Sequence, residues 1–171
     1  WIRKMFEEGA RLKAEHGADN VFDFSIGNPN LTPPENFNRI LQETVSVAGP
    51  GYHRYMPNTG YPEVRLAGDD YLSLEQCVSL TGEEVFMTCG AAGALNVILK
   101  AILDPGDEVI TPTPYFVEYN FYVDNHGGIL KTVPTWNDFT LDIEAIDTAI
   151  NEKTKAVLII SPNNPPGQIY S

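Results

Sequence analysis

The sequence is poor in three features that mark large classes of proteins. Its two cysteines, Cys77 and Cys89, are too few for a disulfide scaffold and too far apart for a CxxC pair. Its longest purely apolar run, residues 156–160, is far short of the ~20 residues that span a bilayer. Only 11 basic residues stand against 23 acidic ones, whereas a nucleic-acid binder needs clustered Lys and Arg to neutralise phosphates. We therefore expect a soluble, cytoplasmic protein with no membrane or nucleic-acid partner.

The sequence does contain enough apolar residues to fill a core, because 43% of its 171 residues are hydrophobic. Its first part mixes helical patterns with loops. Apolar residues recur at helical spacing over residues 1–16, 35–47 and 61–76, and residues 21–26 alternate like a short strand. Residues 27–34 and 48–60 are loops, the first too rich in Pro and Asn for regular structure and the second rich in Gly, Pro and Tyr.

A regular alternation of strands and helices begins near residue 84. Such an alternation is typical of βαβ units, which build a parallel sheet with helices on both faces. The sequence therefore predicts an α/β fold with three layers, α/β/α, and a mostly parallel sheet. The expected strands are residues 84–88, 107–111, 129–133 and 155–160, and the expected helices are residues 91–103, 116–125 and 143–151.

The residues that follow these strands are candidates for a binding site, since ligands of open α/β sheets sit outside the carboxyl ends of the strands. Gly90, Ala91 and Ala92 follow the first strand and open a helix, where small residues and exposed N–H groups favour a phosphate. The alternative is that these small residues only allow tight packing of helix on sheet. The stretch matches neither GxGxxG nor a Walker loop.

Two further loops carry an aromatic and an amide side chain. Phe116, with Tyr115 and Tyr119 beside it, could stack on a flat ring, although the aromatics taken by themselves favour simple packing of the next helix. Asn164 could donate a hydrogen bond to a ligand, or belong to an ordinary Asn/Pro/Gly turn. The three loops together predict a pocket for a planar, phosphorylated ring.

With these motifs the sequence resembles the first part of a class I/II aminotransferase, a pyridoxal-phosphate (PLP) enzyme of fold type I. The likeness covers nearly the whole chain, and the order and spacing of its motifs are highly specific. The matching stretches are residues 25–29 (SIGNP), 55–65 (YMPNTGYPEVR), 87–95 (MTCGAAGAL), 112–119 (PTPYFVEY) and 161–167 (SPNNPPG).

The resemblance implies a role for seven residues in a site for PLP and for amino acid and 2-oxo acid substrates. Gly27 would lie in the loop that meets the substrate carboxylate, and Tyr55 would reach the partner's cofactor phosphate across a homodimer interface. The phosphate of the same subunit would be held by Gly90, Ala91 and Ala92, the ring would stack on Phe116, and Asn164 would bond the 3-oxygen of the ring.

The resemblance also implies the domain organisation and two cis peptide bonds. Residues 1–48 would form an N-terminal helical arm and small-domain segment, and residues 49–171 the first, incomplete part of the PLP-binding large domain. Thr113–Pro114 and Asn164–Pro165 are the candidates for cis bonds.

Two of the departures from the family pattern concern the ring contact and the catalytic lysine. Pro166 stands where the family usually has Thr, which removes a hydroxyl and an N–H near Asn164. The lysine that forms the Schiff base is absent from the 171 residues, so no catalytic residue is assigned and the chain alone is expected to be inactive. The alternatives are a non-catalytic PLP-binding, phosphate-binding or dimerisation fragment, or a fold type I lyase.

Overall fold

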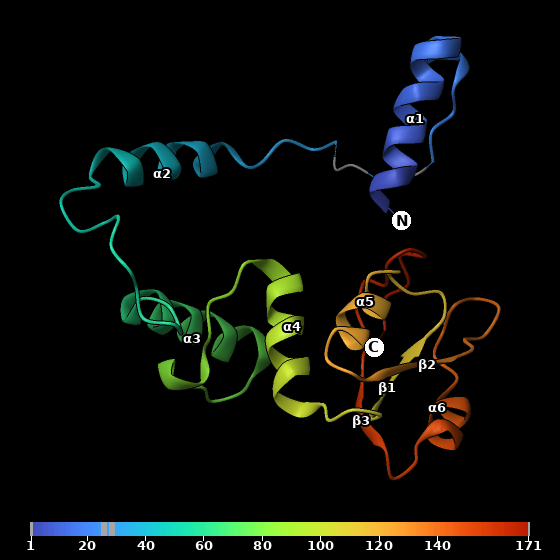
Figure 1. Ribbon diagram of the computed structural model, residues 1–171. Coiled ribbons are helices and arrows are strands. Elements are labelled where there is room, and N and C mark those ends of the chain that lie inside the picture. Colours follow the sequence, from blue (N-terminus) through green and yellow to red (C-terminus); the bar gives the residue numbers. More distant parts are fainter. Residues whose placement is uncertain (1, 25–26, 28–29, 171) are drawn as a thin grey trace. The chain divides into compact units, whose positions relative to one another are not determined.

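The computed structural model describes residues 2–24, 27 and 30–170, and the chain divides after Arg54 into two compact units. Figure 1 shows the elements of both units in the order of the chain. The N-terminal unit, Trp1–Arg54, contains helix α1 (Ile2–His16), the 3-10 turn η1 (Ala18–Asn20) and helix α2 (Glu35–Ser46). These bounds confirm the two helices expected there.

The strand expected over residues 21–26 is not found in its described part. Residues 21–24 pair with no other strand in the described chain, and residues 25 and 26 lie outside it. Instead this segment runs beside α1, where the Lys13 ammonium and the Asp23 carboxylate lie 2.7 Å apart. A Cβ on Gly9 would lie 2.8 Å from the Asp23 Oδ2, so a larger residue there would require the Asp23 carboxylate to shift.

The C-terminal unit, Tyr55–Ser171, alternates helices and strands as expected. Its elements are α3 (Pro62–Gln76), the 3-10 turn η2 (Gly82–Glu84), α4 (Gly90–Ile102), β1 (Glu108–Pro112), α5 (Tyr119–Asp124), β2 (Ile129–Val133), α6 (Ile143–Ala149) and β3 (Thr154–Val157). The strands form one parallel sheet in the order β2-β1-β3.

The expected strand at residues 84–88 was wrong for this structure. Glu84 ends η2, residues 85–88 follow it without pairing to any described strand, and their backbone bonds to other groups instead. The Met87 N–H donates to the Thr59 carbonyl at 3.0 Å, and the Val85 carbonyl accepts from the Arg65 Nε at 2.8 Å. A short run of apolar residues ahead of a helix predicts a strand in such a pattern, but only a neighbouring strand can supply the ladder.

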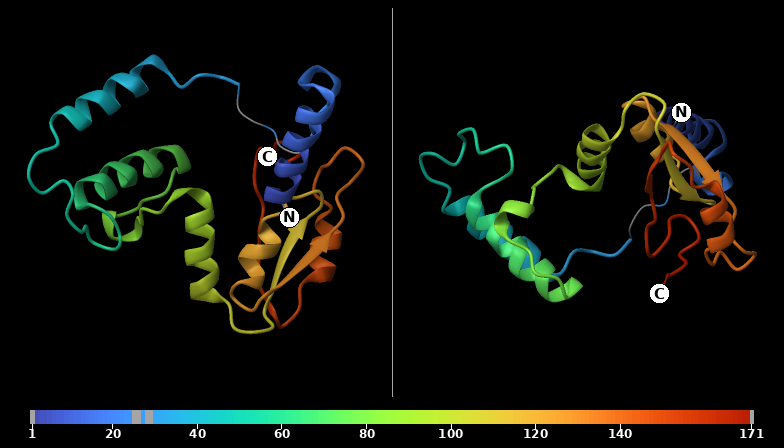
Figure 2. Two further views of the ribbon diagram at one scale, coloured as in Figure 1. Left: turned by 45° about the horizontal axis from the view of Figure 1, so that its top comes forward. Right: turned by 90° about the horizontal axis from the view of Figure 1, so that it is seen from below.

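The core of this unit lies on both faces of the central strand β1. Val109 packs with Leu99 and Leu103 of the α4 region and with Val123 of α5. Ile110, the next residue, points to the other face and packs with Val133 and with Ile146 of α6. Helices α5 and α6 therefore lie on opposite sides of the sheet (Figure 2). This confirms the three-layer α/β/α architecture.

Among the described residues, no helix combines the length and the apolar character that a membrane span requires.

We expect Ile110→Ala to lower the free energy of unfolding by about 2–5 kcal/mol, because it leaves a cavity at a residue with 0% exposure. Ile129→Ala on the neighbouring strand is the matched control. Ile129 is 52% exposed, and its truncation should change stability by no more than about 0.5 kcal/mol. Urea unfolding followed by circular dichroism measures both, and equal losses in the two variants would contradict this account of the core.

Candidate functional site

The loops that follow β1 and β3 meet at the carboxyl edge of the sheet. Both strands run in the same direction, so they end at the same edge. The loop after β1 contains Phe116 and the loop after β3 contains Asn164. The side-chain Nδ2 of Asn163 donates to the Pro114 carbonyl at 3.2 Å and so ties one loop to the other. Two of the predicted site residues therefore lie on loops that the structure joins.

Helix α4 begins toward the same edge, because only a short turn separates its end from the start of β1. No side chain caps it within the described chain. Gly90 has φ of 67°, a conformation that favours glycine, and its N–H donates to the Thr88 carbonyl at 3.0 Å. The donors left for a ligand are therefore the next amides, of Ala91 and Ala92, which lie in a first turn where the helix supplies no acceptor. Both residues are exposed.

Phe116 stands at the edge of an aromatic cluster. Its half-buried ring meets the Tyr119 ring edge to face, with centroids 5.7 Å apart and planes at 83°. Tyr119 is buried and stacks on Tyr115 at 6.4 Å. Tyr115 and Tyr119 therefore do the packing that the sequence allowed as an alternative, while Phe116 keeps part of its surface in solvent. Helix α5 starts at Tyr119 and not at residue 116, since residues 116–118 form the turn that precedes it.

The same cluster contains a strongly perturbed tyrosine. The hydroxyl of Tyr122 donates to the carboxylate of Glu118, which favours the neutral phenol. This hydrogen bond, followed by burial and the negative charge of Glu118, raises the pKa of Tyr122 to about 12. Burial also raises the pKa of Tyr119.

The two adjacent asparagines of the loop after β3 have different environments. Asn164 is exposed, and its side chain makes no hydrogen bond to another described residue, so its amide can meet a ligand. Asn163 is 7% exposed, and its side-chain NH₂ group donates two hydrogen bonds to the protein. Reasoning from sequence missed the role of Asn163, since nothing in the Asn-Asn pair itself says which residue turns inward.

The two predicted cis bonds, Thr113–Pro114 and Asn164–Pro165, are confirmed. Ser161–Pro162 is cis as well, which the sequence did not indicate.

Gly27 and Tyr55, the remaining predicted site residues, belong to different units. Gly27 belongs to the N-terminal unit, is exposed, and has nothing within 4 Å of the place of a Cβ. Tyr55 opens the C-terminal unit, and its side chain is fully exposed. Their roles stay predictions.

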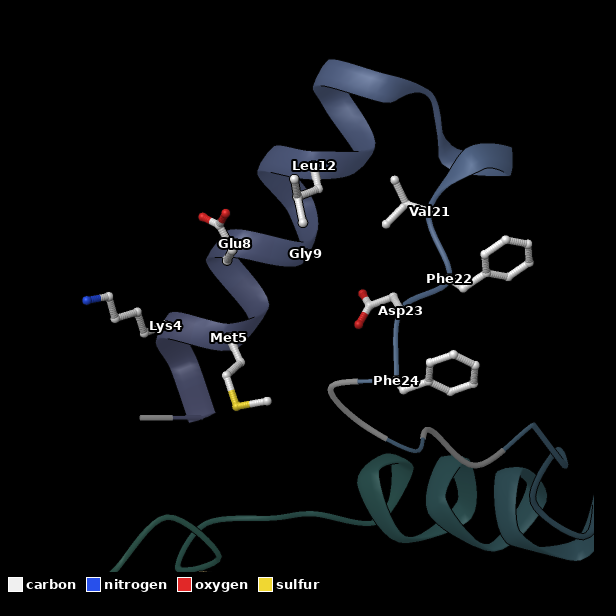
Figure 3. Close-up of a pocket in the computed structure, with 9 residues that line it drawn as sticks. All are labelled: Lys4, Met5, Glu8, Gly9, Leu12, Val21, Phe22, Asp23 and Phe24. Carbon is white, nitrogen blue, oxygen red and sulfur yellow. The ribbon is translucent and has the colours of Figure 1, made fainter.

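A large open groove lies within the N-terminal unit, between α1 and residues 21–24, with a volume of about 890 Å³. Figure 3 shows Val21 and Asp23 directed toward α1 and the rings of Phe22 and Phe24 directed away from it. None of the predicted site residues lines this groove.

Comparison with known proteins identifies the family. The sequence profile of aminotransferase class I and II matches residues 19–171. The chain belongs to this family. It is 35% identical over 153 residues to a probable aspartate/prephenate aminotransferase of Aquifex aeolicus, with 88% of this chain and 38% of that protein covered. It is 38% identical over 148 residues to the aspartate/prephenate aminotransferase of Thermus thermophilus, with 85% and 38% covered.

Solved structures of aminotransferases have the same fold. An amino transferase of Eubacterium rectale superposes with a TM-score of 0.89 at 38% identity, covering 99% of this chain and 44% of that one. A single mutant of the aspartate aminotransferase of Thermus thermophilus gives a TM-score of 0.84 at 32% identity, with 99% and 44% covered. The chain thus spans about two fifths of the length of the aminotransferases it matches.

Class I and II aminotransferases depend on PLP, which confirms the expected cofactor. The residues at the carboxyl edge fit this group. Ala91 and Ala92 offer amides to a phosphate, and a Cβ on Gly90 would meet nothing within 4 Å. Phe116 offers a ring face and Asn164 an amide. In the described part of the chain no three His, Cys, Asp or Glu side chains come together as metal ligands.

We expect Glu118→Gln to lower the pKa of Tyr122 from about 12 toward its ordinary value of 10.0, because the charged acceptor is lost. A pKa that is higher in the folded state means that this interaction stabilises the fold fully below pH ~10 and is lost as the pH rises toward about 12. Alkaline titration of tyrosine absorbance measures the shift, and Tyr122→Phe identifies the residue. Glu144→Gln on α6 is the control, and an equal shift there would contradict the assignment.

Proposed function

We propose that the protein is a PLP-dependent aminotransferase that moves an amino group between an amino acid and a 2-oxo acid. The observation that carries this proposal is the carboxyl edge of the sheet in a chain of this family. There the ring of Phe116 and the amide of Asn164 stand on loops that follow β1 and β3, and the uncapped start of α4 lies toward the same edge. A phosphate, a flat ring and a ring oxygen each find a suitable partner among them.

In this proposal the chain's own residues bind and orient the cofactor. The amides of Ala91 and Ala92 hold the phosphate, and the positive φ of Gly90 turns the chain so that they point outward. Phe116 stacks on the ring, and Asn164 donates to the 3-oxygen. When bound, the cofactor supplies the electron sink on which the amino transfer depends. Gly27 contributes backbone near the substrate carboxylate.

The substrate class stays at amino acids and 2-oxo acids. Two relatives carry the names of aspartate/prephenate aminotransferases, whereas a similar structure from Pyrococcus furiosus is an alanine aminotransferase. We also propose a cytoplasmic homodimer in which Tyr55 reaches the partner's cofactor phosphate. The full exposure of the Tyr55 side chain supports this role.

We expect Gly90→Ala to weaken binding of pyridoxine 5′-phosphate, a form of the cofactor without its reactive aldehyde, by at least about threefold. A side chain at φ of 67° strains the backbone by roughly 1 kcal/mol and turns the following amides away from the phosphate. Equilibrium dialysis measures the affinity.

Gly106→Ala is the matched control for this substitution. Gly106 has φ of 90° and, like Gly90, nothing within 4 Å of a Cβ, but it lies in the turn that leads into β1, at the opposite edge of the sheet. The control should lose similar stability and keep its affinity. Equal weakening in both variants would count against a phosphate site at the start of α4.

A second candidate function is a binding module without catalysis. It is favoured because no lysine of the chain is recognisable as the one that would bind the cofactor covalently. Three of the lysines form interactions with the protein: Lys13 pairs with Asp23, Lys155 lies 3.6 Å from Asp107, and Lys131 donates to the Ala149 carbonyl at 2.8 Å. None stands in the sequence context of the family's cofactor lysine. The fold type I lyase has less support, since the relatives named above are aminotransferases.

The two candidates differ in what happens when the chain is extended to the length of its relatives. We expect the extended protein with PLP to convert an amino acid and a 2-oxo acid into the exchanged pair, measured by chromatography. Borohydride should then fix the cofactor to one lysine beyond residue 171. The 171-residue chain should give neither product. Absence of amino-group transfer by the extended protein would refute the proposed activity. A single stoichiometric adduct on the 171-residue chain would show that this chain does contain the cofactor lysine.

A further inference from the structure

Asn163 is one of two buried polar residues in the described chain. Its side-chain NH₂ group has two hydrogens, and both are used. One bond goes to the Pro114 carbonyl at 3.2 Å and the other to the Tyr170 hydroxyl oxygen at 2.9 Å. An amide at this depth would be costly without partners, so these bonds constrain where the surrounding chain can lie.

The backbone of Asn163 closes the loop in which Asn164 stands. Its N–H donates to the Gln168 carbonyl at 2.7 Å, and its carbonyl accepts from the Gly167 N–H at 2.7 Å. The Tyr170 N–H donates to the Ser161 hydroxyl at 3.0 Å, which closes the same loop a second time. The position of Asn164 is therefore set by its neighbour.

The side chain of Asn163 extends this constraint to the loop after β1. That loop is held on its other side by β2 and the chain after it, since the Thr113 N–H donates to the Val133 carbonyl and the Thr135 hydroxyl donates to the Thr113 carbonyl, both at 2.8 Å. On the β3 side, the bond from Asn163 to Pro114 is the one hydrogen bond between the two loops in the described chain. Pro114 lies two residues before Phe116.

We propose that Asn163 is a positioning residue that sets the distance between Phe116 and Asn164, and thereby the recognition of the 3-oxygen of the cofactor ring. This inference rests on the proposed function. Asn163 itself faces the protein and touches no ligand. It acts by holding the ring platform and the amide donor in one rigid frame.

Asn163→Asp separates this role from general stability. An ionised carboxylate of nearly the same volume can still accept a hydrogen bond from the Tyr170 hydroxyl, but it has no hydrogen to donate to the Pro114 carbonyl. The loop after β3 keeps its internal contact, and the bond between the loops is lost. Tyr170→Phe is the matched control, because it removes the contact within the loop and leaves the donation to Pro114 in place.

The measurement compares pyridoxine 5′-phosphate with its 3-deoxy analogue in equilibrium dialysis against the 171-residue chain at pH 8. The unmodified chain should prefer the 3-hydroxyl compound about fivefold, the value of one ordinary hydrogen bond. Asn163→Asp should reduce this preference to less than about twofold, whereas Tyr170→Phe should keep it. Inorganic phosphate should bind all three with equal affinity, since the start of α4 is unchanged.

The possible outcomes distinguish failure of the positioning role of Asn163 from failure of the proposed function. A preference that survives in Asn163→Asp overturns the positioning role and leaves the proposed function standing. Parallel loss of inorganic phosphate binding, or of the circular dichroism spectrum, in Asn163→Asp would show a merely structural role and overturn it as well. Failure of the unmodified chain to bind either compound would refute the proposed function, and the positioning role with it.

Discussion

The C-terminal unit depends on the burial of β1 on both faces. Val109 and Ile110 are fully buried and point in opposite directions, so each supports a separate core cluster. Helices α4 and α5 must then cover one face and α6 the other, because either face left in water would lose the apolar burial that stabilises the strand. The short connections into β1 and β2 fix where these helices end, and hence toward which edge they begin.

This packing constraint places the candidate site. The apolar side chains of α4 contact the sheet near the helix end, so the small residues at its start are relieved of packing and lie exposed toward the carboxyl edge. The loops after β1 and β3 leave the sheet at the same edge and are joined through Asn163. Binding groups and core residues thus occupy opposite ends of the same elements, which lets the edge vary in chemistry while the core stays the same.

Local patterns predicted most elements of the fold. Strand β2 matches its expected range, and α4, α6 and β1 differ from theirs by at most two residues at either end, since strong periodicity coincides there with Gly and Pro boundaries. The strand expected at residues 84–88 failed because pairing is not a local property: its backbone bonds to Thr59 and Arg65 and not to a strand. The Asn163–Asn164 pair shows the same limit in the site, since which amide turns inward depends on Pro114, 49 residues away.

The two asparagines have different roles because one side-chain amide cannot both anchor the loop and bind a ligand. The pair carries two side-chain amides in the loop after β3, and the loop needs one of these amides to hold Pro114 before the other can be offered at a fixed place. A single asparagine could either anchor or bind, because its NH₂ group has only two hydrogens and Asn163 uses both. The exposed amide of Asn164 therefore costs the fold nothing, and its orientation follows from the buried neighbour that holds the loop.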